Sequence, residues 1–222
     1  MIRFFNQYDI HGLIIRDPIT ASSNLLLFLI GLWCYSRIRK IKRHESSDLN
    51  AGLRGWELFF LVSAFAYLIG IPVHGFSFYI PVEIHFWIWI GMGWTQNVAV
   101  ACAQLGTAKQ YFSTKLKWIR PLIYVQLIFF SALMVYIRKF GAVNADTAVA
   151  LIPIAVLNIC LYAKKKNASC LIGTGILFAS LPAIVVILKF MPAPWLSYND
   201  IAHFLLIGSL LMICKGVERN NE

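Results

Sequence analysis

Three histidines stand beside other polar residues at the ends of long apolar segments. His74 ends one segment, His85 begins the next, and His203 begins the last. Imidazole nitrogen is a preferred ligand of Zn²⁺, and a catalytic zinc site has three protein ligands and one position open to water. Water bound there ionises near neutral pH, which supplies a nucleophile without a catalytic serine or cysteine. The sequence therefore predicts a zinc site formed by these three histidines.

Carboxylates and other polar side chains accompany the histidines. A carboxylate near the metal would act as a general base or orient a ligand, and the candidates for this role are Asp200, Glu83 and Asp17. The polar residues expected to support the site are Asn199, Asn24 and Ser23. On a helix, Asn199 and Asp200 precede His203 by four and three residues, so all three share one face.

Each of these groups also has a simpler interpretation. A histidine at a helix end often only faces water or lipid headgroups. Asn and Asp are favoured helix N-caps, so Asn199 or Asp200 could cap the last helix and Asp17 the first. Three histidines at one membrane depth favour a joint site, whereas a single one would favour the simpler interpretation.

The composition indicates a membrane protein. Of the 222 residues, 59% are hydrophobic and 14% charged, and the mean hydropathy is +0.68. Soluble domains have about 45–50% apolar and about 25% charged residues. This composition disfavours an ordinary water-soluble enzyme. The five cysteines are widely spaced and form no CxxC pair, which disfavours a disulfide framework and a thiol oxidoreductase.

The apolar blocks predict an all-α, seven-helix integral membrane bundle that forms a single domain over residues 1–222. A spanning helix needs about 20 mostly apolar residues. A short turn is expected between Gly75 and Pro81, and two prolines, Pro153 and Pro182, fall inside expected helices, where neighbouring helices can compensate for them. The helices are expected near 20–37, 55–73, 83–104, 118–137, 146–163, 169–189 and 199–215.

The basic residues predict the orientation of the bundle. Of the 20 Lys and Arg residues, fifteen fall in the segments after the first, third, fifth and seventh helices, and five in the alternate segments. The positive-inside rule places the richer set in the cytoplasm, so the N-terminus is outside and the C-terminus is cytoplasmic. The net charge of +10 then reflects topology. We expect membrane lipid as the partner, no nucleic acid, and the bacterial inner membrane as the location, although a eukaryotic organelle membrane would show the same bias.

Three segments resemble known membrane proteins: DPITASSN (Asp17 to Asn24), GIPVHGF (Gly70 to Phe76) and YNDIAHFL (Tyr198 to Leu205). With seven helices and an outer N-terminus, the chain resembles the CREST superfamily of alkaline ceramidases, progestin/adiponectin (PAQR) receptors and Per1-like proteins. It looks closest to a small bacterial seven-helix family of unknown function within or near that group.

The resemblance implies a zinc-dependent lipid amidase, with His74 and His203 as metal ligands. The family pattern also has a Ser four residues before the helix-two His, an Asp eleven residues after it, and a further His opening helix seven. Here those positions hold Gly70, His85 and Asn199. A rearranged site of His74, His85 and His203, or the loss of metal and catalysis, would account for these departures.

Competing functions follow from these observations. The first is a metal-dependent hydrolase of a lipid amide or ester at the outer leaflet. The second is a non-catalytic lipid or ligand receptor, or a scaffold, which Gly70 and Asn199 favour. A transporter ranks lowest, because the ionisable residues gather at one end rather than at the midplane. A retinal pigment is excluded, since Lys215 stands at the end of the last helix and not inside it.

Overall fold

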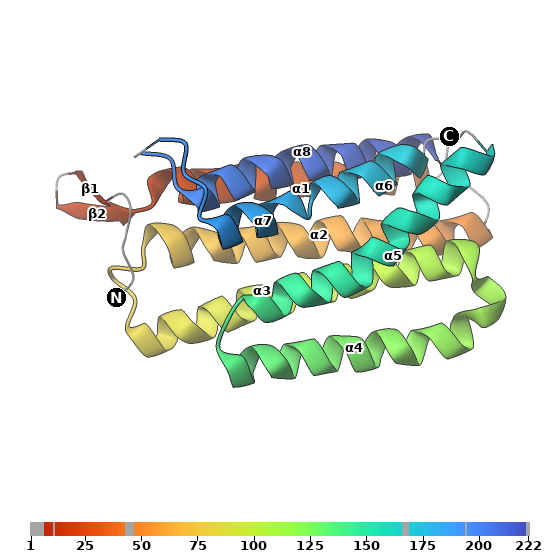
Figure 1. The fold of residues 1–222 in the computed structure, drawn as a ribbon, viewed down its shortest axis with the longest axis horizontal. Helices are drawn as coiled ribbons and strands as arrows, with labels where there is room; N and C mark the ends of the chain where they lie inside the picture. Colours follow the sequence, from red (N-terminus) through yellow and green to blue (C-terminus); the bar gives the residue numbers. More distant parts are fainter. Residues whose placement is uncertain (1–6, 11, 43–46, 166–168, 194, 221–222) are drawn as a thin grey trace.

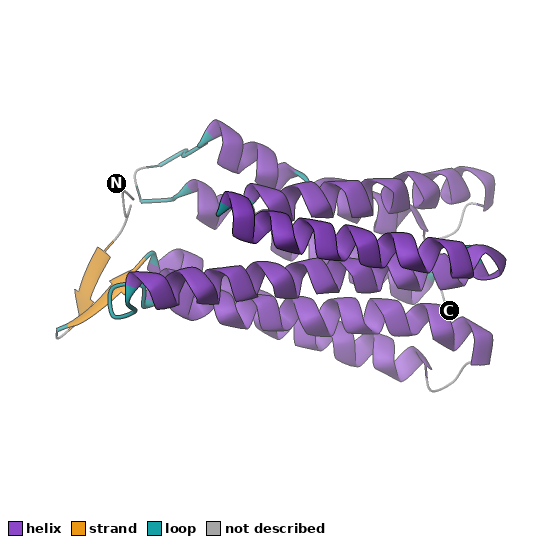
Figure 2. Ribbon diagram, turned by 90° about the horizontal axis from the view of Figure 1, so that it is seen from below, coloured by secondary structure: helices purple, strands orange, loops and turns teal. Residues whose placement is uncertain are grey.

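The computed structural model describes residues 7–10, 12–42, 47–165, 169–193 and 195–220. These residues form a nearly all-helical bundle whose helices run side by side along the long axis of the molecule (Figures 1 and 2). The elements are β1 (Gln7–Ile10), β2 (Leu13–Arg16), α1 (Pro18–Lys42), α2 (Ser47–Gly75), α3 (Val82–Tyr111), the 3₁₀ turn η1 (Ser113–Lys115), α4 (Leu116–Ile137), α5 (Gly141–Lys165), α6 (Ser169–Phe178), α7 (Leu181–Leu188) and α8 (Tyr198–Arg219).

Six of these helical stretches are long and apolar enough to cross a bilayer, so the chain is a multi-pass integral membrane protein. They are Pro18–Ile41, Gly52–Gly75, Ser113–Ile137, Gly141–Lys164, Cys170–Leu188 and Tyr198–Arg219. The helix outside this set is α3, which has the length but contains several polar residues. Two of these polar side chains donate hydrogen bonds to α4: Trp94 to the Ser131 carbonyl and Gln104 to Gln126.

The core lies at the centre of a ring of helices. Each helix of the ring packs on the next, in the order α1, α2, α3, α5, α6 and α8, and α8 packs back on α1. One hydrophobic cluster receives residues from all six, with Leu27, Phe60, Val100, Ile154, Ile176 and Ile213 among its members. Helix α4 lies outside this ring against α3 and α5, and only 11% of its apolar window is buried inside the protein. Its exposed apolar face is therefore expected to contact lipid.

The predicted helix near 169–189 is divided in two. The structure has α6 and α7, separated at Ala179 and Ser180. Pro182 stands at the beginning of α7, where its missing N–H and fixed φ suit a helix start and not a helix interior. By contrast, α5 continues through Pro153, as expected. The turn between Gly75 and Pro81 is also present, between α2 and α3.

The sequence-based boundaries also missed an N-terminal hairpin. The antiparallel strands β1 and β2 pair Gln7 with Arg16 and Ile10 with Leu13. They lie at one end of the bundle, whereas α8 ends at the other (Figure 1). Tyr79, in the turn after α2, holds the hairpin in place, because its hydroxyl accepts a 2.8 Å hydrogen bond from the Ile14 amide.

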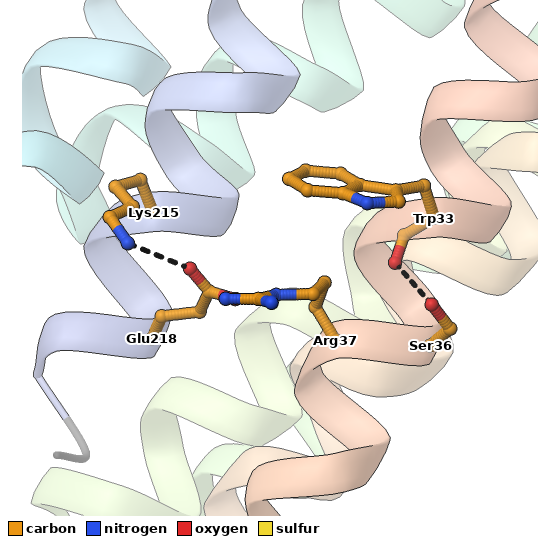
Figure 3. A network of polar contacts seen from close by, with 5 residues as sticks. All are labelled: Trp33, Ser36, Arg37, Lys215 and Glu218. Carbon is orange, nitrogen blue, oxygen red and sulfur yellow. Dashed lines mark hydrogen bonds and ion pairs between the residues drawn. The ribbon is translucent and has the colours of Figure 1, made fainter.

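An ion pair joins α1 to α8 at the end opposite the hairpin. The Arg37 guanidinium lies 2.6 Å from one carboxylate oxygen of Glu218, and the Lys215 ammonium 3.3 Å from the other (Figure 3). Glu218 is buried, so its charge needs these partners.

Candidate functional site

A chain of polar side chains is enclosed at the hairpin end of the bundle, where α1 and α8 begin and α2 ends. Its members come from distant parts of the sequence, because α1 packs against both α2 and α8. Thr20, Ser23, Asn24 and Asp200 are buried, and His74 and His203 are half-buried. We call this set the outer polar network, after the side of the membrane that the sequence analysis expects for this end of the bundle. It contains Thr20, Ser23, Asn24, His74, Asp200 and His203.

Asp200 anchors the network while it caps α8. Its Oδ2 accepts hydrogen bonds from the Ser197 amide and hydroxyl, each over 2.8 Å, and the Ser197 hydroxyl accepts from the Asp200 amide in return. This reciprocal arrangement is a capping box. The other oxygen, Oδ1, accepts a 2.5 Å hydrogen bond from the Thr20 hydroxyl of α1. Both carboxylate oxygens are therefore held within the protein.

The hydrogen bonds around Ser23 fix the proton of His203. The Ser23 hydroxyl donates to the Thr20 carbonyl over 2.9 Å, which uses its single proton. Since Ser23 Oγ also lies 2.8 Å from His203 Nδ1, the imidazole must donate at this nitrogen. A neutral His203 therefore carries a lone pair on Nε2, which can accept a proton donor or bind a metal.

The two central imidazoles of the network face each other. The rings of His74 and His203 lie edge to face, with centroids 5.9 Å apart. His74 ends α2, and its side chain makes no hydrogen bond within the described residues. His85 and Asp200 are also close enough to interact with His74 electrostatically. The arrangement thus leaves two imidazoles with unused nitrogen atoms at one end of the bundle.

The remaining predicted site residues are engaged elsewhere or lie at the edge. His85 is half-buried, and its Nε2 lies 3.0 Å from the Val73 carbonyl of α2. Glu83 is exposed and accepts a hydrogen bond from Trp87 on its own helix. Asn199 is half-buried beside Asp200 on α8. Asp17 precedes Pro18 with φ of 44°, and its carbonyl accepts the first hydrogen bond of α1 from Ala21.

The zinc site expected from the sequence lacks a third ligand in this arrangement. Within the described ranges, no three His, Cys, Asp or Glu side chains are grouped so that they could hold a metal ion. His74 and His203 offer two nitrogen atoms, but His85 Nε2 is occupied by a backbone carbonyl. These donors do not fit a three-histidine zinc centre as they stand, so zinc stays a prediction.

Sequence reasoning did not identify Thr20 and Ser197. The spacing of Ser197 and Asp200 before an apolar run is a capping-box signal that the sequence does contain. Thr20 has no such local signal, because its partner Asp200 is 180 residues away in the chain.

The side chain of Asn24 lies beside Gly70, in the space that a side chain at position 70 would need. The resemblance expects a serine at this position. Its amide donates to the Thr20 carbonyl one turn back on α1. A Cβ on Gly70 would stand 2.7 Å from Asn24 Oδ1 and 2.9 Å from Asn24 Cγ, both too close for a real contact. Glycine at position 70 is therefore a steric requirement of the buried asparagine.

We expect Gly70→Ala to lower the stability of the purified protein by about 1–3 kcal/mol, because the added methyl overpacks the contact with Asn24. The measurement is the free energy of unfolding in detergent. In an Asn24→Ala background the same glycine substitution should cost much less, and Gly91→Ala, which meets nothing within 4 Å, is the matched control. An equal cost of Gly70→Ala in both backgrounds would contradict this packing.

Comparison with known proteins gives one family. Neither the curated proteins nor the solved structures include a match to the chain. Residues 19–222, which include every member of the outer polar network, match the model of a family of unknown function. The chain therefore belongs to this family, DUF6962.

Proposed function

We propose that the chain is a non-catalytic, lipid-binding membrane protein whose outer polar network holds a headgroup that donates a hydrogen bond. The observation that carries this proposal is the lone pair on His203 Nε2, which follows from the directed hydrogen bonds of Ser23. A hydroxyl, amine or amide N–H group of a lipid headgroup would donate to this nitrogen. His74, opposite His203, has unused nitrogen atoms that would make a second contact.

The use of the carboxylates favours binding over hydrolysis. The hydrolase predicted from the sequence uses a carboxylate as the general base for its water. Asp200, which is the carboxylate of the network, is occupied by Ser197 and Thr20. Glu83 faces outward and contacts Trp87. The geometry therefore supports a receptor or scaffold that retains the bundle, which is the second function expected from the sequence.

The proposed topology has seven spans, with α3 as the third and α6 with α7 as the sixth. The N-terminus is outside and the C-terminus cytoplasmic, in the bacterial inner membrane. Two observations support this arrangement: the basic residues gather in alternate segments, and the hairpin and the end of α8 lie at opposite ends of the bundle (Figure 1). The outer polar network then lies at the outer leaflet.

Fluorescent and alkaline phosphatase fusions after Glu222 test the topology. A cytoplasmic C-terminus predicts a fluorescent protein that folds and a phosphatase that stays inactive, because phosphatase needs the oxidising periplasm for its disulfides. Insertions in the segment between α4 and α5 should give the reverse pattern. An active C-terminal phosphatase would contradict the orientation.

The headgroup proposal predicts a preference for phosphatidylethanolamine, whose amine has N–H donors, over phosphatidylcholine, whose amine has none. One added hydrogen bond contributes about 0.5–1.5 kcal/mol, so the preference should be about two- to tenfold in affinity. It is measured by native mass spectrometry of the detergent-purified protein with matched acyl chains.

The matched variants are His203→Phe and His85→Phe. His203→Phe should abolish the preference, whereas His85→Phe should keep it, because His85 is bonded to the backbone outside the network. Equal binding of the two lipids by the unmodified protein, or a preference that survives His203→Phe, would refute the proposal.

A zinc-dependent hydrolase of CREST-like type is the second candidate, favoured by the face-to-edge pair of His74 and His203. In that case these two histidines would be metal ligands, and His85 would have to exchange its bond to Val73 for a place beside them. Metal content of the same preparations separates the two functions. About one zinc per chain, lost in His203→Phe and accompanied by release of fatty acid from a lipid amide, would favour the hydrolase.

A further inference from the structure

A second feature lies far from the outer polar network, where α3 ends and α4 begins. An open cavity of about 260 Å³ lies between the last turns of α3, the first turns of α4 and the middle of α5. It is much larger than the about 30 Å³ that one water takes up in the liquid. All of its lining residues are apolar except Gln104 and Thr107. Such a cavity suits a hydrocarbon chain better than a cluster of waters.

The two polar residues of the cavity differ in their partners. Gln104 donates to Gln126, whose amide donates in turn over 2.7 Å to the buried carboxylate of Asp146 on α5. Gln104 is therefore part of the structure. The Thr107 hydroxyl is buried and has no hydrogen-bond partner.

The state of Thr107 is unusual for a helical threonine. Elsewhere in the protein, Thr95 and Thr174 donate to the carbonyl four residues earlier in their own helices. A buried hydroxyl without a partner is costly, and an acceptor supplied by a ligand would remove the cost. Because Thr107 is a lining residue of the cavity, a molecule bound there could supply this acceptor.

The chain segment beside the cavity carries exposed positive charge. Phe112 and Ile119 line the cavity, and Lys115 and Lys117, which lie between them in the chain, are exposed. The sequence contains no Asp or Glu between Glu83 and Asp146. The expected occupant is therefore an anion with a long apolar tail.

We propose that this cavity binds an anionic phospholipid. One acyl chain occupies the apolar interior, the ester carbonyl accepts the Thr107 proton, and the phosphate contacts Lys115 and Lys117. The order of these residues along the chain agrees with this arrangement. Phe112, which directly follows α3, lies five residues, or about 7.5 Å of helix rise, beyond Thr107 and on the side of the two lysines. In the proposed topology the site faces the cytoplasmic leaflet, whose anionic lipids attract basic segments. The site does not depend on the function proposed for the outer polar network.

The test is the thermal stabilisation of the detergent-purified full chain by phosphatidylglycerol, compared with phosphatidylcholine of the same acyl chains and with inorganic phosphate. We expect saturable stabilisation by phosphatidylglycerol and much less by the other two. If phosphatidylcholine stabilises equally, charge recognition is refuted. If inorganic phosphate stabilises equally, the role of the cavity is refuted.

Variants separate the charged rim from general surface charge. The double variant Lys115→Gln/Lys117→Gln should bind phosphatidylglycerol at least about tenfold more weakly. Lys139→Gln/Lys189→Gln removes two charges at the other end of the bundle and should leave binding unchanged. Equal losses in both double variants would overturn the proposal.

Variants inside the cavity test the acyl chain and the hydroxyl. Ala150→Leu fills a buried position of the lining and should reduce binding, whereas Ala132→Leu on the exposed face of α4 should not. Thr107→Val should leave the lipid-free protein as stable as before or more stable, because it removes an unpaired hydroxyl. The same variant should bind phosphatidylglycerol more weakly. Unchanged lipid binding in both Ala150→Leu and Thr107→Val would contradict the proposal.

Discussion

A carboxylate withdrawn from water at the end of a membrane bundle is tolerated only when protein groups hydrogen-bond to its oxygens. Asp200 meets this requirement with donors from two helices: Ser197 at the start of α8 and Thr20 near the start of α1. The bond to Thr20 therefore fixes the first helix against the last at the hairpin end. At the other end, Glu218 makes the corresponding connection with Arg37 (Figure 3). These two buried acids set the register of α1 on α8, and the outer polar network depends on that register.

The chemistry of the network follows from the position of Thr20. Its carbonyl accepts the Ser23 proton, Ser23 then accepts from His203, and His203 meets His74 at the end of α2. The acids maintain the architecture, while the imidazoles keep unused nitrogen atoms. This division of roles favours recognition of a donor group over the carboxylate-assisted activation of water predicted from the sequence, because the carboxylate beside the imidazoles would have to give up its structural bonds. The same helices that position the network leave a separate apolar cavity at the far end, beyond α3 and α4.

Local patterns in the sequence predicted most of the helices and where some residues of the candidate site would lie. Uncharged apolar blocks predicted the helices, because a bilayer admits little else, and polar residues at the block ends predicted where His74 and His203 would lie. The neighbours of each helix are not a local property. Thus α1 and α8 bring Ser23 to His203, whereas α3 contacts α2 but is not packed on α8, so Glu83 stays outside the network. The bond between Thr20 and Asp200 and the break at Ser180 also depend on packing that a single sequence does not reveal.

The most direct measurement of the central claim is a double-mutant cycle on Thr20 and Asp200. The free energy of unfolding is measured in one detergent for the unmodified protein, Thr20→Val, Asp200→Asn and the double variant. A hydrogen bond to a charged group predicts a coupling of about 1.5–3 kcal/mol between the two positions. Additive effects, within about 0.5 kcal/mol, would show that Asp200 does not hold α1 to α8 and would contradict the account of the network.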